Sequence, residues 1–131
     1  MTTHKLTGNK GETIAADYLQ EKDYIIVERN WRHKHLEVDI IASNNKKLHF
    51  VEVKTRTNTK FGLPEDSISQ AKMNHLKKAA EEYLYQNSQW LKIQFDVIAI
   101  TLKKEIVVEI FLIEDVFFWD WELLDFFTSH Y

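Results

Sequence analysis

The chain of 131 residues contains no cysteine, one proline and three glycines. The lack of cysteine excludes disulfide bonds and thiolate metal sites. It leaves the redox compartment open and is compatible with a reducing cytoplasm. Gly62 and Pro64 both fall within residues 57–66, so we expect this loop to need special backbone angles that most other loops do not.

Long apolar segments are also missing. The longest runs, such as residues 97–100, are far too short to span a bilayer, and the polar first ten residues lack the apolar core of a signal peptide. We therefore expect a cytoplasmic protein without membrane contact. A length of 131 residues with 44% apolar residues suits one domain over residues 1–131, of which 114–131 form an aromatic and acidic tail.

The net charge of −3 argues weakly against a nucleic-acid partner, but the charges are unevenly distributed. Residues 1–80 hold 14 Lys+Arg and 10 Asp+Glu, whereas residues 81–131 hold 3 and 10. One basic face with one acidic region, or chance clustering, explains this asymmetry equally well.

Hydrophobic periodicity and turn residues predict eight elements in the order α-β-β-β-α-β-β-α. This order predicts an α/β fold, with a mixed sheet that has helices on its faces. The long connection after the third strand allows the strands on either side of it to be parallel neighbours. The predicted elements are a helix over 7–22, a strand over 24–31, a hairpin of two strands within 37–56, a helix over 67–87, strands over 92–102 and 106–113, and a helix over 115–127.

The hairpin between Glu37 and Lys54 carries the residues best suited to chemistry. Residues two apart on a strand share a face, so Glu37 and Asp39 point one way, as do Glu52 and Lys54. An even turn places Asp39 opposite Glu52 and Glu37 opposite Lys54, with Cβ atoms about 4.5–5.5 Å apart. An odd turn would place the two pairs on opposite faces.

With an even turn, the hairpin gathers two acids and a lysine, which suits phosphodiester hydrolysis. Mg²⁺ prefers oxygen ligands and often binds through one or two carboxylates plus substrate phosphates. Asp39 and Glu52 would hold Mg²⁺ or Mn²⁺, and Lys54 would orient a water molecule or stabilise charge on the phosphate. The same pattern also describes an exposed hairpin whose Glu37–Lys54 ion pair contributes under about 1 kcal/mol.

Three basic residues outside this cluster are candidates for contact with nucleic-acid phosphates. Arg56 and Lys60 lie in a basic stretch with Phe61, and Lys72 borders the apolar face of the second long helix. A basic groove with an aromatic residue suits a nucleic-acid backbone and an unstacked base. An ordinary exposed loop has the same composition.

Two further acids have less obvious roles. Glu12 lies near the start of the first helix, where the helix dipole favours an acid, and its position alone favours this explanation. Asp96 stands at the start of an apolar strand. We expect it to cap a neighbouring element or to pair with a basic side chain rather than to act in catalysis.

The tail beyond Glu114 has more apolar surface than one helical stripe needs. A helix over 115–127 would place Val116, Trp119 and Leu123 on one face and Trp121 elsewhere. We expect the tail to cover the core; a homodimer contact is the second interpretation.

Several short motifs follow one another across residues 8–117. They are Gly11-Glu12, Asn30-x-Arg32, Glu37-Val-Asp39-Ile-Ile-Ala42, Phe50-Val-Glu52-Val-Lys54-Thr-Arg56, Phe61-Gly62-x-Pro64 and Phe95-Asp96-Val97-Ile98. In this order they resemble the YraN-like family of small bacterial proteins. The resemblance implies a restriction-endonuclease-like fold of the PD-(D/E)XK type, close in layout to archaeal Holliday-junction resolvases. Leu36 departs from the glycine that the family usually has there.

The resemblance also assigns roles to residues. It implies that Asp39, Glu52 and Lys54 are the catalytic positions, and that Glu12 is an additional acid that helps to bind the metal. Glu37 becomes a neighbour of Lys54 rather than a ligand.

Three hypotheses for function follow. The first is a Mg²⁺- or Mn²⁺-dependent nuclease that acts on DNA, including single-stranded or branched DNA. The second is a nucleic-acid-binding protein without cleavage. The third is a protein-interaction domain that works through the aromatic tail.

Overall fold

The computed structural model describes residues 3–57 and 69–116, with side chains in the first helix from Lys10 onward. The predicted order of the first seven elements is confirmed, with bounds shifted by a few residues. The predicted helix over 115–127 falls almost entirely outside the described residues. The elements are α1 (Thr3–Glu21), β1 (Ile25–His33), β2 (Leu36–Asn44), β3 (Lys47–Arg56), α2 (Gln70–Gln86), β4 (Ile93–Lys103) and β5 (Ile106–Ile113).

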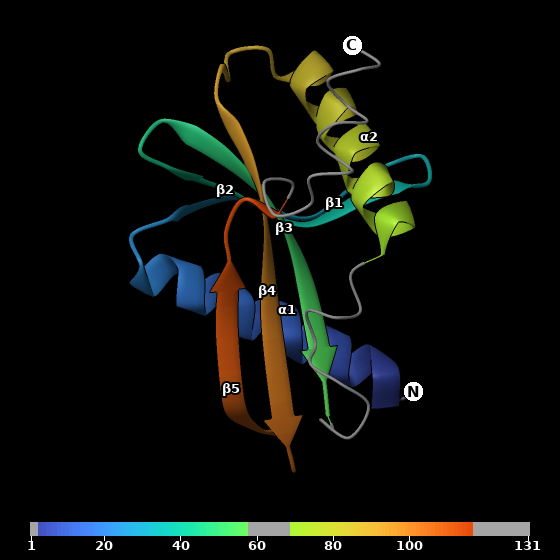
Figure 1. The fold of residues 1–131 in the computed structure, drawn as a ribbon, viewed down its shortest axis with the longest axis vertical. Helices are drawn as coiled ribbons and strands as arrows, with labels where there is room; N and C mark the ends of the chain where they lie inside the picture. Colours follow the sequence, from blue (N-terminus) through green and yellow to red (C-terminus); the bar gives the residue numbers. More distant parts are fainter. Residues whose placement is uncertain (1–2, 58–68, 117–131) are drawn as a thin grey trace.

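The five strands form one sheet in the order β1-β2-β3-β4-β5 (Figure 1). Neighbouring strands are antiparallel except β3 and β4, which are parallel. The chain between β3 and β4 contains α2, as a parallel connection requires. The mixed α/β sheet flanked by two helices is therefore confirmed.

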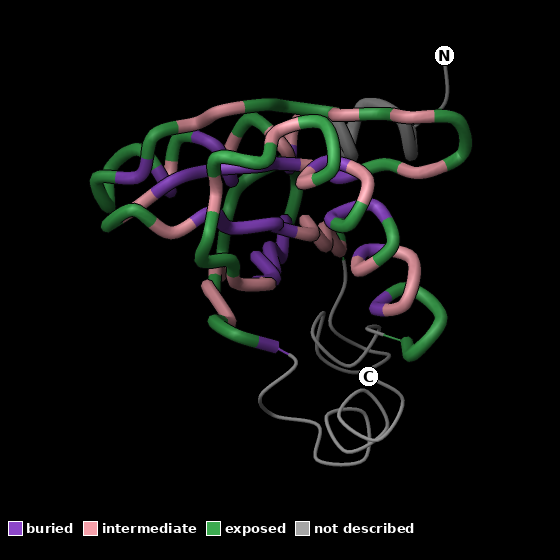
Figure 2. Tube along the Cα trace, turned by 90° about the horizontal axis from the view of Figure 1, so that it is seen from above, coloured by how far each residue is buried: buried purple, intermediate pink, exposed green. Residues whose placement is uncertain are grey.

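The two helices pack on opposite faces of this twisted sheet. Leu19 of α1 packs among apolar residues of β2, β3 and β4, whereas Leu76 and Tyr83 of α2 pack among apolar residues of β2 and β3. Figure 2 shows the buried residues in the interior and the exposed ones along the hairpin turns and outer helix faces. No helix in the described ranges is long and apolar enough to cross a membrane.

Two tight turns adopt left-handed backbone angles without glycine. Asn45 and Lys46 join β2 to β3, and Lys104 and Glu105 join β4 to β5, all four with positive φ. Two-residue turns of this kind match the right-handed twist of the strands. The expectation that most other loops would not need such angles was wrong, because the strand twist favours them at these hairpins. Most of the loop over 57–66 lies outside the described residues, so its own angles stay a prediction.

Gly11 sets how closely α1 approaches the sheet. A Cβ atom at this position would overlap Oγ1 of Thr55 and lie 3.1 Å from the Thr55 Cβ atom. The missing side chain therefore lets the middle of α1 touch β3 at Thr55, and it brings the adjacent Glu12 toward the same part of the sheet.

We expect Gly11→Ala to lower the free energy of unfolding by about 1–3 kcal/mol through overpacking. In an unconstrained helix this change would instead stabilise by about 1 kcal/mol. Adding Thr55→Ala removes the overlapping Oγ1 atom and should recover most of the loss. Urea unfolding of both variants checks this, and a Gly11→Ala protein as stable as wild type would contradict the close approach.

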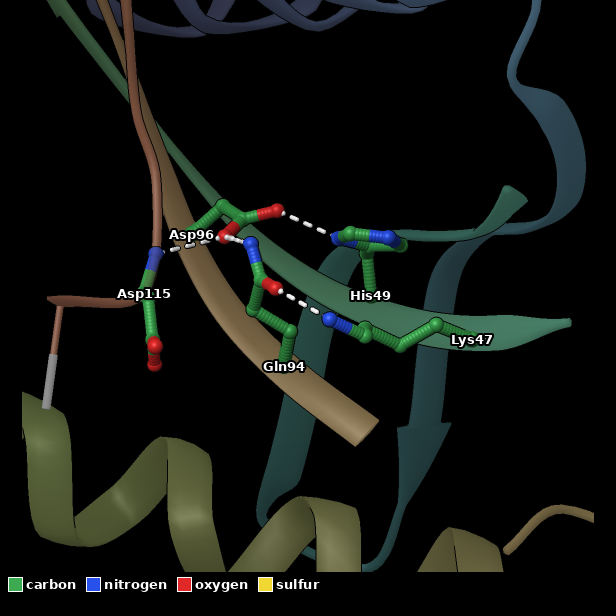
Figure 3. Close-up of polar contacts among 5 residues, drawn as sticks. All are labelled: Lys47, His49, Gln94, Asp96 and Asp115. Carbon is green, nitrogen blue, oxygen red and sulfur yellow. Dashed lines mark hydrogen bonds and ion pairs between the residues drawn. The ribbon is translucent and has the colours of Figure 1, made fainter. Parts of the chain in front are cut away.

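Asp96 is fully buried and ties three segments together (Figure 3). Its Oδ2 atom lies 2.7 Å from Nδ1 of His49 on β3. Its Oδ1 atom accepts hydrogen bonds from Nε2 of Gln94 at 2.8 Å and from the backbone nitrogen of Asp115 at 2.9 Å. Lys47 donates in turn to Oε1 of Gln94 at 3.0 Å. The expectation that Asp96 pairs with a basic side chain is thus confirmed, with His49 as the partner.

We expect Asp96→Ala to lower the free energy of unfolding by about 3–5 kcal/mol, because it leaves buried donors without their acceptor. Asp115→Asn is the matched control. It keeps the backbone N–H group and tolerates the positive φ of 54° at this position, so its effect should stay within about 0.5 kcal/mol. Thermal unfolding followed by circular dichroism distinguishes the two variants, and equal stability would contradict this role.

Candidate active site

The candidate site lies where β2 and β3 separate. These strands pair in a register that runs from Asn44–Lys47 at the turn to Ile40–Val51, and the next residues are Asp39 and Glu52. The turn has two residues, so the predicted even turn is confirmed. Beyond Val51, the Asp39 side chain replaces the strand ladder, since its Oδ2 atom accepts a hydrogen bond from the backbone nitrogen of Val53 at 2.8 Å.

Asp39 is the most strongly perturbed carboxyl group of this site. Its pKa is raised from 3.8 to about 7, chiefly by burial and next by the negative charge of Glu52. The hydrogen bond from Val53 opposes this shift, while Glu12 and Glu37 add to it. Three acids thus act on the largely buried Asp39 carboxyl group, where a positive charge is favourable.

Lys54 supplies one positive charge. Its Nζ atom lies 3.3 Å from Oε1 of Glu52, and the two side chains are only 13% and 26% exposed. Burial lowers the pKa of Lys54, and so does the nearby amine of Lys72, whereas Glu52 raises it. The structure therefore brings Lys72, a residue of α2, next to the hairpin lysine.

Glu37 does not pair with Lys54 as the cross-strand register predicted. Its Oε2 atom lies 3.5 Å from Nε of Arg32 on β1, in an exposed ion pair. Arg32 is the register partner of Glu37 across β1 and β2, whereas the β2–β3 ladder ends at Ile40. Because the strands diverge here, Lys54 forms its ion pair with Glu52 and not with Glu37.

A hollow of about 320 Å³ adjoins the cluster between β2, β3 and α2. Glu37, Glu52, Lys72 and His75 supply its polar lining, and Ala71 and Leu76 its apolar lining. The expectation that His75 faces outward was wrong. It is partly buried, and its ring lies 6.1 Å from that of His35, because the β1–β2 hairpin reaches over α2. A single-sequence pattern carries no signal for this long-range contact.

Of the basic residues predicted to contact phosphates, the structure describes Arg56 and Lys72. Arg56 lies on β3 two residues beyond Lys54, hence on the same face of the strand. Lys60 lies outside the described residues. Of the three candidate phosphate contacts, Lys72 is the one that lines the hollow.

The donor set suits a divalent cation that takes only part of its ligands from the protein. Within residues 3–57 and 69–116, no three Asp, Glu or His side chains converge to form a complete metal cage. Asp39 and Glu52 nevertheless offer hard oxygen ligands that repel each other. Mg²⁺ is often held in this way, by one or two carboxylates with waters and substrate phosphates. Glu12 acts on Asp39 by its charge, and a cation would relieve that repulsion as well.

We expect the free energy of unfolding to fall as the pH rises from about 4 to about 7. The folded protein holds the Asp39 proton more tightly than the unfolded chain, in which the carboxyl has its ordinary pKa of 3.8. The full loss, reached above about pH 7, is up to about 4 kcal/mol. Asp39→Asn keeps an acceptor for Val53 and carries no charge, so this part of the pH dependence should vanish.

Urea unfolding of wild type and variant at about pH 5 and pH 8 measures the difference. Asp17→Asn, which removes an exposed acid of α1, is the control and should keep the wild-type pH dependence. An Asp39→Asn protein with the wild-type pH dependence would show that the carboxyl is not perturbed.

Comparison with known proteins identifies close relatives. The sequence model of the "Uncharacterised protein family UPF0102" matches residues 11–100. A UPF0102 protein of Flavobacterium psychrophilum is 42% identical over 119 residues, which cover 90% of this chain and 98% of the relative. One from Bacteroides fragilis is 43% identical over 76% of this chain and 83% of its own length. One from Christiangramia forsetii is 39% identical over 91% and 99%.

Proposed function

The chain belongs to the uncharacterised protein family UPF0102, and we propose that it is a metal-dependent nuclease that hydrolyses phosphodiester bonds in DNA. The observation that carries this proposal is the Asp39 carboxyl group with a pKa of about 7, next to Glu52 and Lys54. Acids and lysines with perturbed pKa values concentrate at functional sites. Burying charges and placing like charges together destabilises the folded protein, so such an arrangement is more common where it serves binding or catalysis. In this proposal, the sheet and its two helices form a restriction-endonuclease-like fold of the PD-(D/E)XK type.

Asp39 and Glu52 would hold the cation, with Glu12 adding negative charge from α1. A bound Mg²⁺ or Mn²⁺ ion polarises a phosphoryl oxygen and lowers the pKa of water. The hydrogen bond from Val53 holds Asp39 in place, so that its carboxylate needs little reorganisation when the cation binds. Holding polar groups in advance is a large part of electrostatic catalysis.

Lys54 would act on the phosphate and on the attacking water. As an ammonium, its Nζ atom donates hydrogen bonds to the oxygens that gain charge. Burial and the nearby Lys72 lower the pKa of this amine, whereas Glu52 raises it. Its ion pair with Glu52 keeps the amine beside the proposed cation ligands.

The hollow beside the cluster suits one phosphate group of the substrate. Lys72 of α2 lines it, and Lys54 of β3 lies next to Lys72 and to the lining residue Glu52. Glu37 and Glu52 on its wall would repel an anion without a bound cation. Substrate binding and cation binding should therefore depend on each other.

We expect purified protein to cleave DNA in the presence of Mn²⁺ or Mg²⁺, and Lys54→Ala to slow cleavage by about 10²–10³-fold by removing charge stabilisation. Glu52→Gln should do the same by removing a proposed cation ligand. Lys78→Ala, at an exposed lysine of α2, is the matched control and should keep wild-type activity. Gel assays with labelled single-stranded, duplex and branched DNA measure the rates, and circular dichroism verifies folding.

Two other outcomes would redirect the proposal. Cleavage that is unchanged in both Lys54→Ala and Glu52→Gln would identify a contaminating nuclease. Salt-sensitive DNA binding that survives Asp39→Ala, with no cleavage by any variant, would favour the nucleic-acid-binding hypothesis. The interaction hypothesis concerns a tail that lies mostly outside the described residues, and it stays a prediction.

A further inference from the structure

One row of residues crosses three strands on the face of the sheet that carries the candidate site. In the β3–β4 register Lys54 lies opposite Ala99, and in the β4–β5 register Ala99 lies opposite Phe111. Their chain neighbours Val53, Ile98 and Leu112 pack against α1. Because side chains alternate along a strand, Lys54, Ala99 and Phe111 point to the face opposite α1.

The Phe111 ring is unusually accessible for an aromatic side chain on a strand. It is 45% exposed, whereas Ala99 between it and Lys54 is 1% exposed and carries only a methyl group. Two strand spacings separate Lys54 from Phe111, or about 10 Å. In Figure 1, β3, β4 and β5 run side by side in front of α1, and α2 lies toward the other end of the sheet. Ala99 is itself almost inaccessible to solvent, so the accessible part of this row is Phe111.

Charges on this face differ between β3 and β5. Lys54 and Arg56 lie on β3 about 6.6 Å apart, a separation similar to that of successive phosphates in an extended single strand. In the Arg56 row, the residue on β5 is Glu109. A phosphate backbone is therefore attracted to β3 and repelled by β5, which leaves the uncharged part of a nucleotide to reach Phe111.

We propose that Phe111 is a stacking platform for an unpaired nucleobase of a single-stranded nucleic acid whose phosphates follow β3 past the candidate site. This inference rests on the proposed function, and it makes that function more specific, because the bases of a duplex are already stacked on one another. Stacking of one base on an aromatic side chain contributes about 1–3 kcal/mol. Phe111 is not part of the cation site, so it acts on substrate binding and not on the reacting atoms.

The test compares the affinity of labelled oligothymidylate with that of an abasic oligonucleotide of the same length, by fluorescence anisotropy with Ca²⁺. We expect Phe111→Ala to weaken oligothymidylate binding by about 5- to 150-fold, the factor that corresponds to one stacked base. The abasic strand should bind wild type and Phe111→Ala equally well. Phe111→Trp keeps a ring and should retain the wild-type affinity.

Tyr85→Ala is the matched control. Tyr85 is an 85% exposed aromatic residue on α2, and its removal should not change binding. Equal affinity of wild type and Phe111→Ala for oligothymidylate, in a protein that does bind DNA, would overturn the stacking role and leave the proposed function standing. If wild type binds neither oligonucleotide but cleaves duplex or branched DNA, the stacking role falls and the proposed function stands; if it neither binds these strands nor cleaves any DNA, both proposals fail.

Light scattering on the same samples measures the oligomeric state, and so tests whether a second copy of the chain covers Phe111 instead of a nucleobase. A dimer that becomes a monomer in Phe111→Ala, with unchanged DNA affinity per chain, would assign Phe111 to self-association and overturn the proposal. A Phe111→Ala protein that stays in the wild-type oligomeric state and loses affinity supports it.

Discussion

The hydrogen bond from the backbone of Val53 to the Asp39 carboxylate is the interaction on which the candidate site depends. At this point β2 and β3 diverge, and a side chain takes over from the strand ladder in satisfying a backbone donor. The divergence opens space for the hollow between the hairpin and α2. The acceptor that closes the ladder is also the carboxyl group whose pKa is most strongly raised within the site.

The repulsion among the acids around Asp39 destabilises the folded protein, whereas the rest of the structure stabilises it. Glu12, Glu37 and Glu52 all raise the pKa of Asp39, and Lys54 lies in a place that disfavours its own charge. The cores on both faces of the sheet and the buried Asp96 network hold these groups together despite their repulsion. Such strain is typical of sites that bind a ligand of opposite charge.

Sequence patterns predicted well whatever depends on local geometry. The alternation of residues 37–54 and the short polar turn predicted that Asp39 stands opposite Glu52, since a two-residue turn favours one strand pairing. In the structure these two residues come directly after the last pair of the ladder, Ile40 and Val51. The partner of Glu37, the inward position of His75 and the pairing of Asp96 with His49 were not predictable in this way. Each depends on how segments tens of residues apart twist or pack against one another.

The sequence by itself determined the order of the first seven elements and the facing acids of the hairpin, because these follow from periodicities of a few residues. The long connection after the third strand allowed a parallel pair without requiring one. Only the tertiary structure decided which charges surround Asp39, because α1, β1 and α2 bring theirs in from distant parts of the chain. It also placed Phe111 in the row of Lys54. That alignment exists because β4 pairs with β3 on one side and with β5 on the other, and no local pattern contains this register.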